Sequence, residues 1–260
     1  MGKNQSSVNK ISLVTPMYNE EARVEGAMYG LKAQLSKIGL PFEIILINDG
    51  STDRSFEIAK TLSVRIPELK VVGYKNNAGR GKAMRVGFSY ATGDLVVTTE
   101  SDSSWGEDII IRLVDALMKN PEVDFVIASP HLKGGGYRNV PKYRVLISEI
   151  GNIILRLTFF GKTTMATGMT RCYRKKILDT VLLESNQKEI HLEILSKLLS
   201  LGYTFIEIPA VLSWKKDSKG NKRKSNFKII KLVWSHLLFS FNEKPAIFIG
   251  STGLISLILG

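Results

Sequence analysis

The chain has little of the chemistry that builds disulfide frameworks or zinc sites. Cys172 is its only cysteine, and its three histidines are scattered without the spacing of metal ligands. A single thiol excludes a disulfide framework and favours a reducing compartment. The glycine patterns of a dinucleotide-binding turn and of a P-loop are also absent from the sequence. Neither of these nucleotide-binding classes is therefore indicated.

The first residues lack the features of a signal peptide. Residues 1–10 are mostly polar, and the first apolar run, Ile11 to Val14, is far too short for the hydrophobic region of a leader. We expect residues 1–10 to form a disordered lead-in. The 260-residue chain as a whole has an ordinary globular composition, with 44% hydrophobic and 23% charged residues. It fits one large α/β domain, alone or with an appendage.

Acidic residues are scarce near the end of the sequence. The formal net charge is +12, which implies an anionic partner such as a membrane, a nucleic acid or a phosphorylated metabolite. Much of the excess falls within residues 215–231, where Asp217 is the only acid. Apolar residues then recur at helical spacing, which predicts an amphipathic interfacial helix over residues 227–244. Residues 245–260 carry no charge and are slightly fewer than the ~20 that cross a bilayer. They favour the beginning of a truncated membrane helix over the alternative, a core helix.

Apolar, β-branched runs alternate with helical patterns through the rest of the chain. This rhythm predicts a mostly parallel sheet sandwiched by helices, in one α/β domain over residues 11–226. The expected strands are Ile11–Pro16, Glu43–Asn48, Lys70–Tyr74, Asp94–Thr99, Asp124–Ser129 and Thr204–Ile208. The expected helices are Glu20–Ile38, Asp53–Val64, Gly81–Tyr90, Glu107–Lys119 and Tyr143–Leu157.

Carboxylates follow two of these strands. Asp49 and Asp53 come after the second expected strand, and Glu100 and Asp102 come after the fourth. The C-terminal ends of parallel strands are where open α/β sheets bind ligands. In a basic chain, carboxylates there suggest a chelated divalent cation and a phosphorylated substrate. The segment from Asp49 to Asp53 is also typical of an ordinary turn followed by a helix cap.

Two loops suit a nucleotide, and each has a simpler explanation. After the first strand, the ring of Tyr18 and a nearby carboxylate are suited to stacking on a nucleobase and hydrogen bonding to it. Alternatively, Asn19 caps the helix that follows. The glycine-rich segment 77–83 suits phosphate binding through its backbone amides, assisted by Arg80 and Lys82. Alternatively, its glycines only make the turn.

The motifs form an ordered series, and as a set they resemble glycosyltransferase family 2, the inverting nucleotide-sugar transferases of the GT-A (Rossmann-like) fold. The likeness covers about residues 11–230. Its motifs are Pro16-Met17-Tyr18-Asn19-Glu20, Asn48-Asp49-Gly50-Ser51-Thr52-Asp53, the segment 77–83, Gly93-Asp94 and Glu100-Ser101-Asp102. Within that family, the chain looks most like polyprenyl-phosphate glycosyltransferases such as dolichyl-phosphate mannose synthase. This second likeness is carried by the basic C-terminal stretch and by Lys133-Gly134-Gly135, Thr167-Gly168, Glu193 and Pro209.

The resemblance implies an enzyme that transfers a hexose, with inversion, from a nucleotide diphosphate sugar of the GDP-mannose or UDP-glucose type to a polyprenyl (dolichyl) phosphate. The alternative acceptor is a sugar hydroxyl of a polysaccharide or glycolipid, which needs a carboxylate base, whereas a lipid phosphate is already anionic. Glu193 is the first candidate for that base, although the simpler explanation is a glutamate on a helix surface. A nucleic-acid-binding module and a sugar-nucleotide-binding protein without turnover are the competing classes.

The resemblance also implies the residues of the site. The nucleotide sugar is expected to contact Pro16, Tyr18, Glu20, Ile47, Asp49, Arg80, Lys82 and Ser101. The expected catalytic residues are Asp102 and Glu100, which with Ser104 are also the expected ligands of Mg²⁺ or Mn²⁺. The acceptor phosphate is assigned to Lys133, Arg138, Arg144 and Lys215. The C-terminal segments are expected to hold the protein on a membrane, with its catalytic domain in the cytoplasm and no nucleic acid as partner.

The sequence departs from the family pattern at several of these positions. Glu100 stands for the first aspartate of Asp-x-Asp, and Ser104 and Trp105 stand where close relatives have Gln and His. Pro130 replaces an arginine expected near the phosphates. Lys215 replaces a late arginine and cannot reproduce its bidentate phosphate binding. We expect compensation from one or more of Arg138, Arg144 and Arg171.

Overall fold

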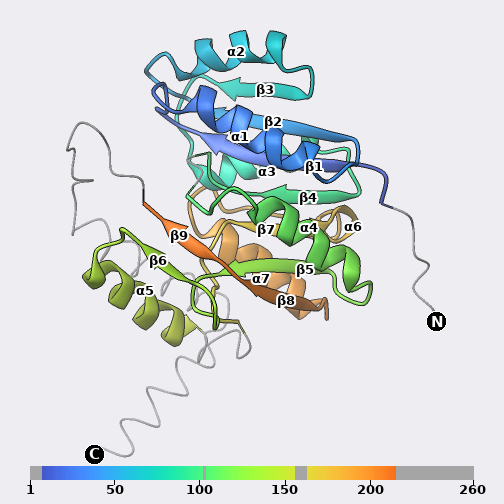
Figure 1. Ribbon diagram of the computed structural model, residues 1–260, viewed down its shortest axis with the longest axis vertical. Coiled ribbons are helices and arrows are strands. Elements are labelled where there is room, and N and C mark those ends of the chain that lie inside the picture. Colours follow the sequence, from blue (N-terminus) through green and yellow to red (C-terminus); the bar gives the residue numbers. More distant parts are fainter. Residues whose placement is uncertain (1–7, 102–103, 156–162, 215–260) are drawn as a thin grey trace, which may run out of the picture.

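The computed structural model describes residues 8–101, 104–155 and 163–214. A seven-stranded sheet forms its framework, made of β1 (Ile11–Met17), β2 (Phe42–Asp49), β3 (Leu69–Tyr74), β4 (Leu95–Thr98), β5 (Phe125–Ser129), β7 (Arg171–Arg174) and β8 (Phe205–Pro209). The strands lie in the order β3-β2-β1-β4-β7-β5-β8 (Figure 1). The apolar runs predicted as strands form the buried layer in β1, β2, β4 and β5, whereas the edge strands β3 and β8 are only partly buried.

The sheet is mostly parallel, as predicted. β1 pairs in parallel with β2 and β4, which places Val14 opposite Ile45 on one side and Thr98 on the other. β2 and β3 are parallel, and so are β5 and β8. β7 runs antiparallel between β4 and β5, and the sequence did not predict it. The arginines at its two ends give the segment the pattern of exposed chain. In the structure, Arg171 is as buried as its apolar neighbours.

Helices cover both faces of the sheet. They are α1 (Val24–Ser36), α2 (Ser55–Arg65), α3 (Arg80–Tyr90), α4 (Ile109–Lys119), α5 (Lys142–Leu155), α6 (Lys175–Leu178) and α7 (Ile190–Ser200). In Figure 1, α1 and α4 lie in front of the sheet and α3 and α7 lie behind it. A side chain at Gly87 would collide with Val14 and Ile47, so this glycine allows α3 to pack directly on β1 and β2.

A second, two-stranded sheet lies to one side of the first. It pairs β6 (Gly136–Arg138) in parallel with β9 (Val211–Ser213), and α5 lies beside β6 (Figure 1). The backbone N–H of Ser213 donates to the carbonyl of Ser104 at 2.7 Å, and the N–H of Trp214 donates to the carbonyl of Arg138 at 3.0 Å. The first bond brings β9 against the loop that follows β4, and the second joins the residue after β9 to β6.

Several sequence predictions fall outside the described residues. The amphipathic helix of residues 227–244 and the hydrophobic segment of residues 245–260 are among them, as are residues 1–7 of the expected lead-in. The domain boundaries drawn there stay predictions. Among the residues that the structure describes, the helices are too short or too polar to cross a membrane.

Candidate active site

A cleft of about 290 Å³ lies where β1, β2 and β4 end. This is the edge at which open parallel sheets bind ligands. The residues that line it are Pro16, Met17, Tyr18, Glu20, Asp49, Arg80, Glu100, Ser101, Ser104, Met169, Leu212 and Trp214. The cleft therefore joins the first half of the chain to residues just before β7 and to β9.

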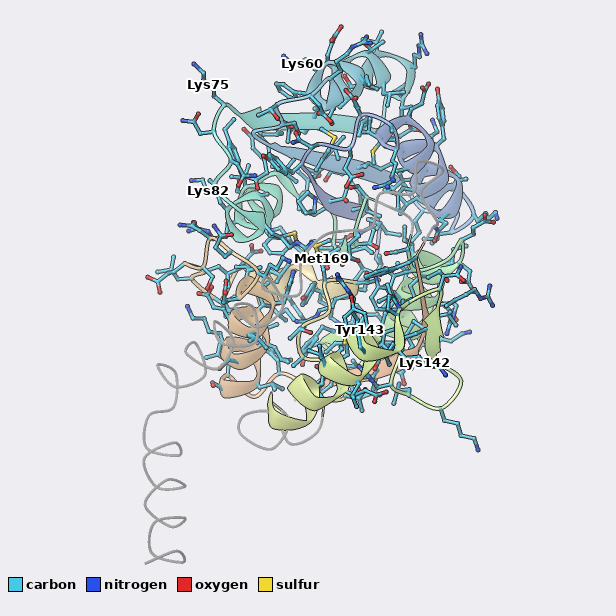
Figure 2. The ribbon with its side chains drawn as sticks, turned by 90° about the vertical axis from the view of Figure 1, so that its left-hand side faces the viewer. Lys60, Lys75, Lys82, Lys142, Tyr143 and Met169 are labelled. Atoms are coloured by element: carbon cyan, nitrogen blue, oxygen red, sulfur yellow. The ribbon has the colours of Figure 1, made fainter. Side chains whose placement is uncertain are left out.

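Most residues predicted to contact the nucleotide sugar come together in this cleft. Two do not. Ile47 is fully buried in β2, where it packs beneath α3. Lys82 is exposed and projects outward, as does Lys75 (Figure 2). Asp102 and Lys215 lie outside the described residues, so their roles stay predictions.

The loop after β1 is held by the loop after β2. The N–H of Asn19 donates to the Ser51 hydroxyl at 3.0 Å, its side-chain oxygen accepts the N–H of Thr52 at 2.8 Å, and the N–H of Glu20 donates to the Ser55 hydroxyl at 2.7 Å. The alternative that Asn19 caps its own helix is wrong, because α1 begins only at Val24. The pairing of the two loops fixes Tyr18 and Glu20 at the cleft.

Asp53 organises the start of α2. Its carboxylate accepts the backbone N–H of Ser55 at 3.0 Å and that of Glu21 at 3.3 Å. Burial alone would raise the pKa of Asp53, but hydrogen bonds from Ser55 and from the Glu21 amide outweigh it and hold that pKa below its ordinary value. Asp53 thus follows the simpler prediction of a turn leading into a helix.

Asp49 lies at the cleft, and its carboxylate is fully engaged with the chain. It accepts hydrogen bonds from the Tyr74 hydroxyl at 2.7 Å, the Asn77 side chain at 3.0 Å, and the backbone amides of Ala78 at 2.9 Å and Gly79 at 3.1 Å. Burial and the neighbouring Asp49 carboxylate raise the pKa of Tyr74, so this phenol stays protonated and donates. Asp49 therefore holds the segment that leads into α3.

This arrangement corrects the expected phosphate cradle. The amides of Ala78 and Gly79 donate to Asp49, and that of Lys82 donates to the Asn186 carbonyl at 3.2 Å. For these three amides the prediction of phosphate binding is wrong. Gly79 has a φ of 98°, and a side chain there would collide with residues 186 and 187, so this glycine is required by both conformation and packing. What the segment brings to the cleft is the side chain of Arg80.

Glu100 follows β4 and lines the cleft. Its Oε2 accepts the indole N–H of Trp105 at 2.6 Å and the hydroxyl of Thr170 at 3.1 Å. Its Oε1 lies 4.0 Å from Nη1 of Arg80. The carboxylate is thus held on one side by two neutral donors and faces a guanidinium on the other.

The described part of the site offers hard oxygen donors suited to Mg²⁺ or Mn²⁺. These are Oε1 of Glu100 and the hydroxyls of Ser101 and Ser104, which all line the cleft. Within residues 8–101, 104–155 and 163–214, no three His, Cys, Asp or Glu side chains are grouped closely enough to form a metal site of their own. The donor chemistry fits a hard divalent cation, and the ligand predicted as the firmest, Asp102, lies outside those ranges.

Three of the residues predicted for the acceptor phosphate are described, and they lie in or near the second sheet. Lys133 and Arg138 are exposed, the first in the loop after β5 and the second in β6. On α5, the guanidinium of Arg144 lies 5.0 Å from the centre of the Trp214 ring and 5.8 Å from that of Tyr143. Trp214 lines the cleft, so Arg144 contacts a residue of the cleft wall.

Arg171, the third candidate to compensate for Pro130, is not available to a phosphate. It is fully buried and donates to the carbonyls of His191 at 3.0 Å and Ala166 at 2.5 Å. Its guanidinium instead holds the segment that leads into β7.

Glu193 is neither a surface glutamate nor placed as a base. It is 2% exposed on α7, and its oxygens accept the amides of Glu184 and Ser185 at 2.8 Å each and the Lys197 ammonium at 2.7 Å. Burial alone would raise the pKa of Glu193, but these hydrogen bonds, that of Lys197 first, hold the pKa below its ordinary value. Both explanations drawn from the sequence are therefore wrong.

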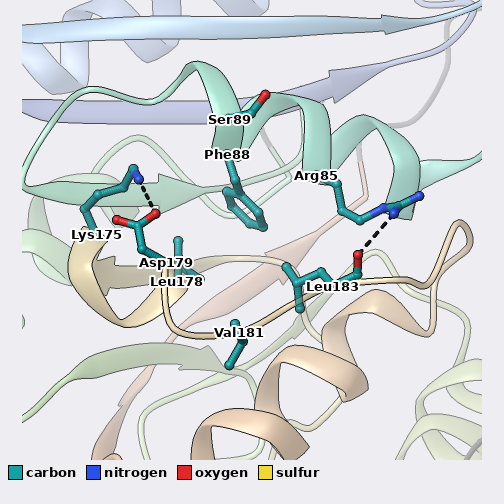
Figure 3. A pocket seen from close by; sticks show the side chains of 8 residues that line it. All are labelled: Arg85, Phe88, Ser89, Lys175, Leu178, Asp179, Val181 and Leu183. Carbon is teal, nitrogen blue, oxygen red and sulfur yellow. Dashed lines mark hydrogen bonds and ion pairs between the residues drawn. The ribbon is translucent and has the colours of Figure 1, made fainter.

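A second hollow lies between α3 and the segment that joins β7 to α7 (Figure 3). Its charged side chains are engaged with the chain: Lys175 pairs with Asp179 at 2.5 Å, and Arg85 donates to the Leu183 carbonyl at 3.0 Å and to the Asn186 side chain. Its lining residues differ from those of the cleft. The cleft, where the predicted residues meet, is thus the candidate active site.

Sequence reasoning missed the apolar residues of the cleft. Met169 lies near the middle of the molecule (Figure 2) and follows the Thr167-Gly168 motif, which was the available signal for it. Trp214, which follows β9, also lines the cleft. Met17 and Leu212 carry no signal that separates them from ordinary core residues.

Comparisons with known proteins agree with this geometry. The family model described as Glycosyl transferase family 2 matches residues 12–182. The chain is 31% identical over 203 residues to a dolichol-phosphate mannosyltransferase of Pyrococcus furiosus, covering 75% of this chain and 56% of that protein. It is 29% identical over 256 residues to an undecaprenyl-phosphate 4-deoxy-4-formamido-L-arabinose transferase of Pectobacterium atrosepticum, covering 97% of this chain and 74% of that protein. The chain thus spans little more than half the length of the first relative.

Among solved structures, the fold is similar to glucosyl-3-phosphoglycerate synthase of Mycobacterium tuberculosis in complex with Mn²⁺, uridine diphosphate and glucosyl-3-phosphoglycerate. The TM-score is 0.64 at 18% identity, covering 89% of this chain and 80% of that one. At this identity the likeness shows the fold alone. The family match covers the strands and loops that build most of the cleft, and the chain therefore belongs to glycosyl transferase family 2.

Proposed function

We propose that the protein transfers a hexose, with inversion, from a nucleotide diphosphate sugar of the GDP-mannose or UDP-glucose type to a polyprenyl phosphate. The observation that carries the proposal is the cleft itself, in which the predicted nucleotide-sugar residues of three loops meet beside Trp214 and Arg144. The names of the relatives, a dolichol-phosphate and an undecaprenyl-phosphate transferase, support the choice of acceptor.

The donor half of the proposal uses the loops after β1, β2 and β4. Tyr18 is 45% exposed at the cleft, so its ring is available to stack on a base. Arg80 is suited to the diphosphate, because a guanidinium binds phosphate oxygens in pairs. Both side chains stand on segments fixed by hydrogen bonds, which orients them before the substrate arrives.

A divalent cation completes this half of the proposal. When bound, Mg²⁺ or Mn²⁺ supplies positive charge that stabilises the departing nucleoside diphosphate. The residues that would hold it are Asp102, Glu100 and Ser104. The solved glucosyl-3-phosphoglycerate synthase, which shares the fold, contains Mn²⁺.

The acceptor half requires a cation and no base. An oxygen of the lipid phosphate attacks the anomeric carbon as the bond from that carbon to the diphosphate oxygen breaks, and the nucleoside diphosphate leaves. The attacking oxygen is already anionic, so no proton has to be removed. This suits a protein in which the carboxylate of Glu193, the predicted base, already accepts hydrogen bonds from Lys197 and two backbone amides. Arg144, held against Trp214, is the proposed partner of the acceptor phosphate.

We further propose that residues 227–260 hold the enzyme on a membrane with its catalytic domain in the cytoplasm. In the sequence, the basic stretch of residues 215–231 leads into apolar residues at helical spacing and then an uncharged segment. Basic residues near anionic headgroups contribute roughly 1 kcal/mol each. A chain ending at Phe227 should lose liposome binding and activity on a long-chain lipid, while it still binds sugar nucleotide. A shortened chain that stays on liposomes would contradict this.

The proposed reaction is tested with membranes from cells that make the full chain. They are incubated with a panel of radiolabelled GDP- and UDP-sugars, and membranes carrying Asp102→Asn are the control. We expect label from one sugar in an organic-extractable, acid-labile lipid. Label that enters polysaccharide instead would contradict the lipid acceptor. No transfer from any sugar would contradict the reaction.

A further inference from the structure

Trp105 lies in the loop that connects β4 to α4. Its ring is 4% exposed, and its indole N–H donates to Oε2 of Glu100 at 2.6 Å. A hydrogen bond to a carboxylate is stronger than one between neutral groups. The indole N–H has this one hydrogen to donate, so the ring orients Glu100 as well as filling space.

Thr170 provides a second donor to the same oxygen. Its hydroxyl lies 3.1 Å from Oε2 of Glu100, and Thr170 itself is fully buried just before β7. A carboxylate oxygen accepts through two lone-pair sites, and the two donors occupy both. Oε2 is therefore saturated by Trp105 and Thr170.

The loop that carries Trp105 is held independently of Glu100. Gln34, buried on α1, donates to the carbonyl of Gly106 at 3.3 Å and accepts the N–H of Ile110 at 3.1 Å. These two bonds hold the backbone next to Trp105 and at the start of α4 without involving Glu100. A ligand whose hydrogen-bond partner is itself rigid is held in one orientation.

The remaining oxygen of Glu100 faces the cleft. Oε1 lies 4.0 Å from Nη1 of Arg80, and both side chains line the cleft. Oε1 is thus the oxygen of Glu100 that lies on the side of the cleft, and in the described structure it is next to the guanidinium of Arg80.

We propose that Trp105 is a positioning residue of the donor site: with Thr170, it holds Glu100 so that Oε1 alone is offered to a divalent cation. Glu100 would then contribute a single oxygen to the cation, beside the guanidinium of Arg80. The inference rests on the proposed function only in requiring that the site takes a divalent cation.

The test measures Mn²⁺ affinity of the full chain in detergent by electron paramagnetic resonance of free Mn²⁺. Trp105→Phe keeps a buried ring and removes the N–H, and Thr170→Val removes the hydroxyl. Each should weaken Mn²⁺ binding about tenfold, which is the lower end of the loss expected when a group that orients a metal ligand is removed. Tyr173→Phe, which removes a buried hydroxyl that contacts Arg171, is the matched control and should leave the affinity unchanged.

A double-mutant cycle separates positioning from a general effect on packing. If Trp105 acts through Glu100, Trp105→Phe should have no further effect on Mn²⁺ affinity in a Glu100→Gln chain. Should Glu100→Gln bind too weakly to measure, the Thr170→Val chain is the second background, in which Trp105→Phe should cost less than it does alone. Equal losses in every background would overturn the proposal, as would an unchanged affinity in Trp105→Phe or a full chain that binds no Mn²⁺.

The outcome is independent of lipid transfer. A full chain that shows the coupled loss of Mn²⁺ affinity and yet labels no lipid supports the role of Trp105 and contradicts the proposed acceptor. Labelled lipid together with no coupling between Trp105 and Glu100 supports the proposed function and overturns the inference.

Discussion

The backbone N–H of Gly79 lies 3.1 Å from each carboxylate oxygen of Asp49, thirty residues earlier in the chain. The end of β2 thereby fixes the residue directly before α3, and with it the position of Arg80. The loop after β2 and the start of α3 are thus one unit, although they are separated by α2 and β3.

Asp49→Asn tests whether this contact is structural. The amide nitrogen of asparagine would face donors that now point at a carboxylate, so we expect a loss of about 2 kcal/mol in the free energy of unfolding. Thermal unfolding without nucleotide measures it, and Asp115→Asn, at an exposed ion pair with Lys119, is the control with little expected effect. A higher KM with unchanged stability would instead indicate that Asp49 serves only the nucleoside.

Asp102→Asn should abolish transfer and leave the fold intact. A carboxylate at this strand end is proposed to bind the cation that stabilises the leaving group, so its loss should reduce the rate by orders of magnitude. Steady-state transfer and circular dichroism measure the two effects. Asp108→Asn is the matched control, because that aspartate is mostly exposed a few residues further on. An active Asp102→Asn enzyme at limiting metal would contradict the assignment, and Glu100→Ala should be milder.

Tyr18→Ala should weaken nucleotide binding more than turnover. Stacking on a base contributes about 1–3 kcal/mol and is distant from the reacting bond, so we expect KM to rise about tenfold with little change in kcat. Tyr29→Ala is a close control, since Tyr29 is also 45% exposed but stands on α1, outside the residues that line the cleft. A collapsed kcat with unchanged KM would exclude the stacking role.

Arg144→Gln should raise the KM for the lipid acceptor about tenfold and leave the KM for the sugar nucleotide unchanged, because a charge-assisted hydrogen bond to phosphate is lost. Arg144→Lys should recover little, since an ammonium does not stack on Trp214 as a planar guanidinium does. Lys142→Gln, at the exposed start of the same helix, controls for net charge. Equal effects of Lys142→Gln and Arg144→Gln would indicate a general electrostatic attraction.

Glu193 should make stability depend on acid. Its pKa is lowered in the folded protein from an ordinary value of 4.5, so its contribution is fully present above about pH 4.5 and is lost as the pH falls through the folded pKa. Glu193→Gln should therefore lower Tm at neutral pH, and the difference from the unaltered chain should shrink at lower pH. We would compare the Tm of the two chains from about pH 3 to about pH 7. The acid limit is near the pH at which ordinary glutamates become protonated. A constant difference would mean that the charge of Glu193 is unimportant.

Local patterns were sufficient to predict most of the sheet and part of the cleft. Runs such as residues 44–47 are apolar throughout, because parallel strands are covered on both faces, and their ends mark the ligand edge. This is why Tyr18, Asp49 and Glu100 were found from the sequence. β7 was missed because Arg171 is buried through contacts that only the folded chain provides.

The contacts that define the chemistry could not be predicted, because they join distant segments. Nothing near Glu193 in the sequence indicates that the amides of Glu184 and Ser185 turn back to it. Likewise, Trp105 stands five residues from Glu100, but the sequence indicates neither its bond to that carboxylate nor the contact of Gln34, from another helix, with the same loop. A motif places a residue at an edge, whereas its partners follow from the packing of the whole domain.

β7 is made after both of the strands that it separates. During synthesis, β1 to β4 leave the ribosome first, and β4 keeps an unpaired edge until residues 171–174 emerge to fill it. Glu100 gains the hydroxyl of Thr170 only at that moment, seventy residues after its own appearance. A nascent chain therefore carries most of the residues that line the cleft before β7 pairs with β4, and Leu212 and Trp214 complete that lining only afterwards.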